Sequence, residues 1–218
     1  MKKLLIIAAG GLARETAAVA VRSTLWDLAG FLDDEPALVG TQIAARPVLG
    51  GIDTVIEHHD ASLLVCAGKG RSRQAIVARL RELGIGDDRY ATLIAPDVHL
   101  PMSCSVGTGS ILLSGSVLTA DVIVGAHVVA MPGVVLTHDN VVRDFATLCA
   151  RVTLGGNVLV GEAAYLGMGA LVREGVEVGH DSVLGMGAVL LRDLPPGETW
   201  VGLPANSIRR SSTVQEKV

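Results

Sequence analysis

The dipeptide His138–Asp139 is the first candidate for chemistry in this chain of 218 residues. A neutral imidazole near its normal pKa is a suitable general base at neutral pH. A carboxylate that accepts its other N–H fixes the tautomer and stabilises the imidazolium as it forms. A histidine without such a neighbour is most often an exposed side chain on a polar corner. The adjacent acid therefore makes His138 a candidate general base.

Two small clusters near the N-terminus, one of glycines and one of aspartates, are spaced like parts of a ligand site. Gly10–Gly11 stand between a predicted strand, Lys3–Ala8, and a predicted helix, Leu12–Arg22. This arrangement offers N–H groups and a helix N-terminus to a phosphate, but it also opens ordinary α/β units. Asp33–Asp34 end a second predicted strand, Leu28–Leu32, about 22 residues after the glycines, where an acidic residue commonly binds a ribose hydroxyl. The alternative for the acidic pair is a solvated turn.

A third loop of this kind is Gly68–Lys69–Gly70, which follows an apolar strand predicted over Ser62–Ala67. A helix is predicted over Arg71–Leu83, because its apolar residues recur on one face. Pro47–Gly51 reads as a further short strand and turn. Alternating strands and helices of this size predict a small, Rossmann-like parallel α/β domain over residues 1–90.

The His138–Asp139 pair lies inside a repeat of six residues. Every sixth residue is aliphatic, and seventeen such positions in a row are very improbable by chance in a chain that is 50% hydrophobic. Glycine mostly follows every third member, so three hexads make one turn of a triangular coil. Stacked at the strand spacing of about 4.8 Å, about five turns form a prism roughly 26 Å long. The residues that should line the axis are Ile94, Leu100, Val106, Leu112, Leu118, Val124, Ala130, Leu136, Val142, Leu148, Leu154, Val160, Leu166, Val172, Val178, Leu184 and Leu190.

Prolines end the repeat after the last axial residue. Pro195–Pro196 cannot continue a central strand ladder, and Thr199–Pro204 reads as one last extended piece that folds back. The coil domain is therefore predicted over residues 91–210. Residues 211–218 are polar and are expected to form a disordered tail.

Composition excludes several classes of protein. The net charge of −4, with acidic and basic residues interspersed, offers no surface for nucleic acid. The apolar run Ile111–Leu136 contains Asp121, His127 and Pro132 and keeps the six-residue register, so we do not expect it to span a membrane. Three cysteines, far apart and without a CxxC pair, favour reduced thiols in a cytoplasmic protein.

These motifs together resemble one family of enzymes. The glycine turn, Phe31–Asp34, the hexads, His138–Asp139 and Val201–Ala205 are similar to those of hexapeptide-repeat nucleotide-sugar acetyltransferases, over nearly the whole chain. The family includes bacillosamine and perosamine N-acetyltransferases, and the sialic acid O-acetyltransferases are close relatives. The resemblance, and not the spacing, implies that the coil is a left-handed parallel β-helix. It also implies a homotrimer with each site at the seam between two subunits.

The resemblance implies a role for each candidate residue. His138 would be the catalytic base and Asp139 would raise its basicity, with no metal involved. Met168 and Met186 are eighteen residues apart and should stack on one corner, either as simple packing or as the lining of a pantetheine arm. The implied contacts to acetyl-CoA are Thr147, Gly156, Met168 and Met186. The implied contacts to the nucleotide sugar are Gly10, Gly11, Leu12, Asp33, Asp34, Gly68 and Lys69.

Four positions depart from the pattern of the family. Ala8 replaces the first glycine usual in the turn, and Leu12 stands where many members have a histidine. Arg143 replaces the glycine expected after Val142, and Thr147 occupies a place where a second histidine is common. The general base is therefore better supported than the contacts to the nucleotide or the acyl donor.

Three functions remain open. The first is transfer of acetyl from acetyl-CoA to the amino group of a nucleotide-linked deoxyamino sugar, for surface glycans or glycoconjugates, with O-acetylation of a sugar such as sialic acid as the alternative. The second is a non-catalytic trimer in which the coil serves assembly. The third is zinc catalysis of the hexapeptide carbonic anhydrase type, which needs three converging histidines and is disfavoured because the histidines do not share one corner. The offset from the preceding axial residue is five for His99, three for His127, and two for both His138 and His180.

Overall fold

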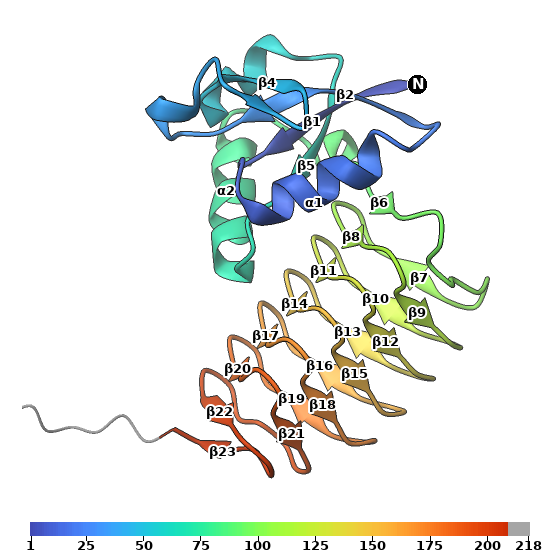
Figure 1. The fold of residues 1–218 in the computed structure, drawn as a ribbon. Helices are drawn as coiled ribbons and strands as arrows, with labels where there is room; N and C mark the ends of the chain where they lie inside the picture. The colour runs from blue at the N-terminus through green and yellow to red at the C-terminus, as the bar shows by residue number, and fades with distance from the viewer. Residues whose placement is uncertain (209–218) are drawn as a thin grey trace, which may run out of the picture.

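The computed structural model describes residues 1–208, so the tail expected at residues 211–218 lies outside the described part. Figure 1 shows a small α/β part at one end of the molecule and a long coil of short strands that extends from it. The predicted fold class is confirmed, because a mostly parallel α/β sheet is followed by a left-handed parallel β-helix.

The α/β part consists of a five-stranded sheet with a helix on each face. Its elements are β1 (Lys2–Ile7), α1 (Gly11–Ala20), β2 (Trp26–Leu32), β3 (Gln42–Ile43), β4 (Arg46–Gly50), β5 (Ser62–Val65) and α2 (Gly70–Glu82), with 3₁₀ turns at Pro36–Leu38, Ile52–Glu57 and Asp87–Arg89. The strand order is β3-β4-β2-β1-β5. Successive residues of a strand point to opposite faces. Leu4 of β1 therefore packs with α1, whereas Leu5 packs with Val77 of α2.

Strand β3 was not predicted, and its turn explains why. It pairs antiparallel with β4 through a turn at Ala44 and Ala45, whose φ angles are 49° and 56°. Two-residue hairpin turns with positive φ at both positions normally carry Asn-Gly or Asp-Gly. Two alanines give no such signal in the sequence.

The coil is built from strands of two residues that pair in parallel, one turn above the next. All seventeen predicted axial residues belong to one core cluster, and fourteen of them are buried. Ile94, Leu100 and Val106 are only partly buried, at the end of the coil where the chain enters. The predicted register is therefore confirmed. The strands are β6 (Leu93–Ile94), β7 (Ser105–Val106), β8 (Ile111–Leu112), β9 (Val117–Leu118), β10 (Ile123–Val124), β11 (Val129–Ala130), β12 (Val135–Leu136), β13 (Val141–Val142), β14 (Thr147–Leu148), β15 (Thr153–Leu154), β16 (Leu159–Val160), β17 (Tyr165–Leu166), β18 (Leu171–Val172), β19 (Glu177–Val178), β20 (Val183–Leu184) and β21 (Val189–Leu190).

Three sheets form the faces of the prism. We call β6-β8-β11-β14-β17-β20 the first face, β9-β12-β15-β18-β21 the second face and β7-β10-β13-β16-β19 the third face. The first, second and third corners are the turns that follow the corresponding faces. Each corner contains a residue with positive φ, such as Gly187, Asp139 and Asp181 at the first, second and third corners, at 65°, 61° and 57°. This conformation turns the chain sharply from one face to the next.

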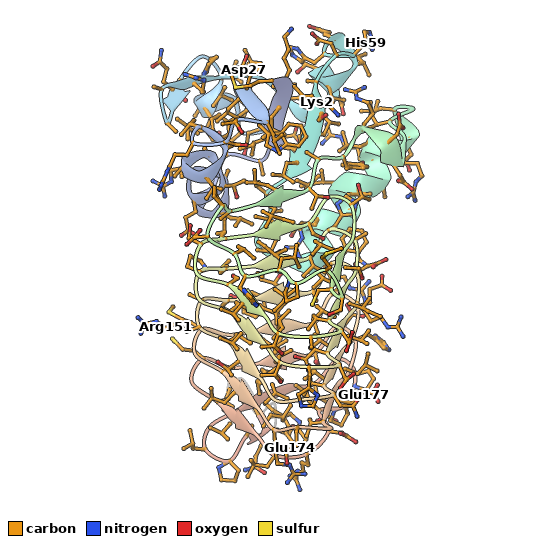
Figure 2. The ribbon with its side chains drawn as sticks, turned by 90° about the vertical axis from the view of Figure 1, so that its right-hand side faces the viewer. Lys2, Asp27, His59, Arg151, Glu174 and Glu177 are labelled. Atoms are coloured by element: carbon orange, nitrogen blue, oxygen red, sulfur yellow. The ribbon has the colours of Figure 1, made fainter. Side chains whose placement is uncertain are left out.

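The α/β part lies over the first face and the third corner. The core beside α1 continues into Ile111 and Val129 of the first face. Gly70, the first residue of α2, lies so close to Phe145 and Ala163 of the third corner that a Cβ would collide with them. Figure 2 shows charged side chains such as Arg151 and Glu177 on the outside of the coil, far from Asp27 and His59 of the α/β part.

The extended piece predicted over Thr199–Pro204 continues the stack of the first face, and the chain folds back only after it. Strand β22 (Thr199–Val201) pairs in parallel with β20, and β23 (Asn206–Ser207) returns antiparallel to β22. Within residues 1–208, no helix is long and apolar enough to cross a membrane.

Candidate active site

His138 and Asp139 form a hydrogen-bonded pair at the second corner. Nδ1 of His138 lies 2.7 Å from Oδ2 of Asp139, and the side chains are 65% and 58% exposed. The imidazole lies against Gly156 of the next turn, where a Cβ would overlap the ring. No described residue forms a hydrogen bond with Nε2 of His138. The pair therefore has the arrangement of a general base, with the carboxylate on one ring nitrogen and the other nitrogen free.

The corner around this pair is held by buried polar groups. The hydroxyl of Thr137 donates to the carbonyl of Leu154 at 2.9 Å, and Nδ2 of Asn140 donates to the carbonyl of Gly155 at 2.7 Å. Asn140 itself is fully buried. These bonds link the corner to the next turn, so the exposed imidazole stands on a rigid base.

The glycine turn and the aspartate pair meet at the carboxyl ends of β1 and β2. Asp33 accepts hydrogen bonds from the N–H of Ala9 at 2.7 Å and from the N–H of Glu35 at 2.9 Å. Gly10 and Gly11 border open space, since a Cβ on either would meet nothing within 4 Å. Parallel α/β sheets bind ligands at this edge. The structure therefore brings together the predicted glycines and Asp33.

Asp34 is tied to a residue that sequence reasoning missed. Its carboxylate forms an ion pair with Arg79 of α2, which also contacts Asp53 at 2.7 Å. The hydrogen bond from Arg79 lowers the pKa of Asp34. Asp33, Asp34 and Arg79 line a cavity of about 320 Å³ beside Ile52. No motif indicated Arg79, because an arginine on an exposed helical face has no special spacing.

Two residues at the turn depart from a simple glycine site, the predicted contact Leu12 and the nearby Ala8. The side chain of Leu12 is 7% exposed and packs in the core of the α/β part, so only its backbone faces the turn. Ala8 has a φ of 75°, the left-handed region that favours glycine. The alanine in place of the usual glycine is therefore held in a strained conformation, which costs about 1–2 kcal/mol.

Met168 and Met186 stack on the first corner, as predicted. The N–H of Gly187 donates to the carbonyl of Met168 at 2.8 Å, and the two methionines are 54% and 74% exposed. Both line a groove of about 530 Å³ on the first face, with Cys149 and Tyr165 on its floor. We call it the methionine groove. Its mostly apolar lining fits a flexible pantetheine arm.

Thr147 and Gly156, the other two predicted acyl-donor positions, do not lie in this groove. Thr147 is fully buried beneath the loop at Gly68, and Gly156 lies under His138 on the second corner. Their contacts to an acyl donor therefore stay predictions. In one chain, the methionine groove and His138 lie on different corners of the prism.

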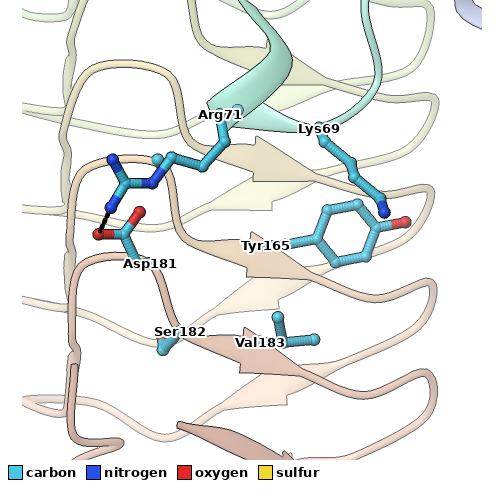
Figure 3. A pocket seen from close by; sticks show the side chains of 8 residues that line it. Lys69, Arg71, Tyr165, Asp181, Ser182 and Val183 are labelled. Carbon is cyan, nitrogen blue, oxygen red and sulfur yellow. Dashed lines mark hydrogen bonds and ion pairs between the residues drawn. The ribbon is translucent and has the colours of Figure 1, made fainter. Parts of the chain in front are cut away.

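A second cavity of about 530 Å³ opens beside Lys69, between the start of α2 and the third corner. Figure 3 shows Arg71 paired with Asp181 at one side of this cavity and Tyr165 and Val183 on the coil below. A hydrogen bond with Cys149 and burial raise the pKa of Tyr165 to about 12, so its phenol stays neutral. Tyr165 lines both this cavity and the methionine groove.

His180–Asp181 is a second histidine–aspartate pair, and the sequence analysis missed it. The ring nitrogen Nδ1 of His180 lies 3.0 Å from Oδ2 of Asp181. The dipeptide repeats that of His138, at the same offset of two from an axial residue, so the signal was present. Unlike Asp139, Asp181 is already paired with Arg71 and only 23% exposed.

His127 has a structural environment. It stacks on Phe145 at 5.0 Å between ring centroids and meets the edge of Tyr90 at 4.7 Å. Burial lowers its pKa to about 4, so the ring is neutral at physiological pH. Among the described residues, no group of three His, Cys, Asp or Glu side chains is placed to hold a metal ion.

Similarity to known proteins agrees with this geometry. The model of the PglD N-terminal domain family matches residues 3–80. The acetyltransferase domain of PglB from Neisseria gonorrhoeae FA1090, solved in complex with acetyl coenzyme A, is 28% identical over 95% of this chain and 99% of that chain, with a TM-score of 0.87. No curated protein sequence matches the chain.

Two further structures have the same fold. PerB from Caulobacter crescentus, in complex with CoA and GDP-perosamine, is 30% identical over 94% of this chain and 97% of that chain, with a TM-score of 0.84. WeeI from Acinetobacter baumannii AYE is 24% identical over 94% of this chain and 99% of that chain, with a TM-score of 0.85. The fold and the exposed pair His138–Asp139 thus define a hexapeptide-repeat acyltransferase. Within that class, the chain belongs to the nucleotide-sugar acetyltransferases.

Proposed function

We propose that this protein transfers the acetyl group of acetyl-CoA to an amino group of a nucleotide-linked deoxyamino sugar, in the synthesis of a surface glycan or glycoconjugate. The observation that carries the proposal is the exposed pair His138–Asp139, whose Nε2 is free for a substrate. The PerB structure with CoA and GDP-perosamine supports this class of acceptor.

His138 acts as the general base in this proposal. Acetyl-CoA supplies an acetyl thioester, and the acceptor amine forms the new N–C bond as the C–S bond to CoA breaks. Nε2 of His138 takes the proton that the amine loses, and that proton leaves with the CoA thiol. Asp139 holds the proton on Nδ1 and stabilises the imidazolium. No covalent bond to the protein is needed.

The site is proposed to form between two copies of the chain in a homotrimer. The methionine groove lies on the first face and the first corner, whereas His138 lies on the second corner. A groove on one subunit can face the histidine of its neighbour when three prisms pack side by side. Gly10, Gly11, Asp33, Gly68 and Lys69 would hold the nucleotide sugar on the subunit that supplies the groove.

One observation favours an amine over a hydroxyl as the acceptor. Glu15 of α1 lines the methionine groove, and it carries the one charge among the described residues of that lining. No described residue forms an ion pair with its carboxylate. A carboxylate above an apolar floor would attract the ammonium form of an amino sugar, which must give up one proton to solvent before the neutral amine attacks, and it would give no such gain to a hydroxyl. O-acetylation remains the second candidate.

We propose that the protein acts in the cytoplasm, because acetyl-CoA and nucleotide sugars are made there. Three cysteines, Cys66, Cys104 and Cys149, are free thiols, as the reducing cytoplasm favours.

The test is to incubate the protein with acetyl-CoA and a panel of UDP-, dTDP- and GDP-linked amino sugars while free thiol is measured. We expect thiol release with at least one amino sugar and none with its hydroxyl analogue. Release with the hydroxyl analogue alone would replace N-acetylation by O-acetylation. A protein that binds the panel but releases no thiol with any acceptor would be the non-catalytic trimer.

A further inference from the structure

Arg73 of α2 is a fully buried cation with no carboxylate partner in the described part of the chain. Its guanidinium is instead surrounded by six oxygen acceptors. The distances are 2.9 Å to the carbonyl of His127, 2.8 Å to Ala67, 3.1 Å to Gly68, 2.6 Å to Phe145, 2.9 Å to Ala146 and 3.0 Å to the hydroxyl of Thr147.

This arrangement is costly and specific. Removing a charge from water is expensive unless it is paired or fully hydrogen-bonded. Burial lowers the pKa of Arg73 to about 10, so the side chain is still charged at neutral pH. The planar fork of a guanidinium carries five N–H donors, whereas the compact ammonium of lysine carries three and cannot satisfy all six of these oxygens. The six acceptors come from two distant parts of the chain, the loop after β5 and the coil, where they belong to the third corner and to β14.

The bonds to the loop fix the direction of two peptide groups. The carbonyls of Ala67 and Gly68 point at the guanidinium. Both peptide bonds are trans, and the C=O and N–H of a trans peptide point in opposite directions. The N–H groups of Gly68 and Lys69 are therefore turned away from Arg73. Neither donates a hydrogen bond to a described residue.

These two N–H groups lie where a ligand is expected. They follow β5, whose end is beside β1, since the N–H of Cys66 donates to the carbonyl of Ile7 at 2.8 Å. The carboxyl edge of a parallel sheet is the binding edge of α/β folds. A Cβ on Gly68 would meet nothing within 4 Å, so the loop borders open space. Successive free N–H groups form a concave site that suits an anion.

Thr147 completes the link between the loop and the coil. Its hydroxyl donates to the carbonyl of Gly68 at 2.9 Å and accepts from Arg73. Thr147 belongs to β14, and Cys149, two residues further on, lines the methionine groove. The chain of contacts therefore runs from the loop to the strand beneath that groove.

We propose that Arg73, with Thr147, is a positioning residue that presents the Gly68 and Lys69 N–H groups to a phosphate of the nucleotide sugar. Arg73 does not touch the ligand in this proposal. It holds the loop against the coil, so that the nucleotide keeps a fixed position relative to the methionine groove. The inference rests on the proposed function, because it takes the anion to be a nucleotide phosphate.

The first test compares Arg73→Lys with Arg81→Lys, an exposed arginine of the same helix. Calorimetry would measure binding of UDP, GDP and dTDP, and separately of acetyl-CoA. Arg73→Lys should weaken binding of the preferred nucleoside diphosphate roughly tenfold or more, since three ammonium donors on a shorter head group leave some of the six oxygens unbound and loosen the loop. Acetyl-CoA binding should change less than about twofold, the spread expected of an indirect effect. Arg81→Lys should leave both unchanged.

The second test uses Thr147, in case Arg73→Lys does not fold. Thr147→Val keeps the shape but removes the hydroxyl, so it should weaken nucleoside diphosphate binding, and Thr147→Ser should restore it. A merely structural role would lower the melting temperature without this selective loss. If Thr147→Val instead weakens acetyl-CoA binding alone, Thr147 is a donor contact and the proposal is overturned.

The two proposals fail in different ways. If Arg73→Lys and Thr147→Val fold and bind nucleoside diphosphates as tightly as the wild type, the positioning role is overturned. The proposed function then still stands. Wild-type protein that binds no nucleoside diphosphate overturns the phosphate assignment. A wild type that binds them but never consumes acetyl-CoA overturns the proposed function alone.

Discussion

The two histidine–aspartate pairs show how position decides what a residue can do. Both have Nδ1 of the histidine on the following carboxylate, and both aspartates have positive φ. Asp181 is also bound by Arg71 beneath the α/β part, whereas no Lys or Arg within residues 1–208 pairs with Asp139. A carboxylate already paired with an arginine stabilises an imidazolium less, because its charge is shared. The free pair is therefore the better base.

Replacement of His138 tests this assignment. His138→Ala should lower turnover by roughly 10² to 10⁴, the usual contribution of positioned proton transfer, while acetyl-CoA binding and the fold remain. Asp139→Asn should cost less. His180→Ala is the matched control and should keep near-normal turnover; the reverse order of effects would move the base to His180.

His127 makes a prediction about stability and pH. Its pKa falls from an ordinary 6.5 to about 4 in the folded protein, chiefly through burial and secondly through the charge of Arg73. Between these pH values the unfolded chain binds the proton more readily, so the free energy of unfolding decreases as pH falls from about 6.5 to about 4. The loss attributable to this group is at most about 3 kcal/mol. Urea unfolding at several pH values gives the free energy of unfolding as a function of pH. That free energy should fall less steeply with decreasing pH in His127→Gln than in the wild type.

At the scale of elements, the coil could be predicted because each turn repeats the same physical requirement. Every sixth residue, such as Leu154, must be aliphatic because it lines the axis, and the chain must turn sharply at each corner. The α/β strands were found from their apolar runs. The hairpin at Ala44 was not, because its turn lacks the usual residues. Arg73 and Arg79 also escaped notice, since their partners are distant in sequence and only the folded chain brings them together.

The axial register predicts the effect of a buried charge. Leu154 is fully buried in β15, so Leu154→Asp should place an unpaired carboxylate on the axis and destabilise the coil by several kcal/mol, about 3 or more. Leu171 of β18 points out of the same face and is 45% exposed. Leu171→Asp should have a much smaller effect on thermal unfolding. Equal melting temperatures for the two variants would show that the register is wrong.

At the scale of the molecule, the outside of the coil exposes apolar side chains that the proposed trimer would cover. Exposed apolar side chains on the faces and corners include Ile123, Met168, Leu171 and Met186, at 52%, 54%, 45% and 74% exposure. Met168 and Met186 lie on adjacent turns of the first corner, and an exposed apolar patch of this kind is typical of an interface. Light scattering at micromolar concentration should therefore give three times the chain mass of 22.5 kDa. A monomeric mass would remove both the trimer and the site between subunits.

Mixed trimers separate a shared site from a site within one chain. His138→Ala removes the base, and Met186→Arg should block the methionine groove with a charge, so each variant alone should be nearly inactive. Suppose that the groove of one subunit works with the histidine of its neighbour. A seam is then active when its groove comes from a His138→Ala subunit and its histidine comes from a Met186→Arg subunit. Random mixing in equal amounts makes that combination at about one quarter of the seams, so co-expression should recover about a quarter of the wild-type rate. Recovery no greater than the sum of the separate variants would mean that each chain uses its own histidine.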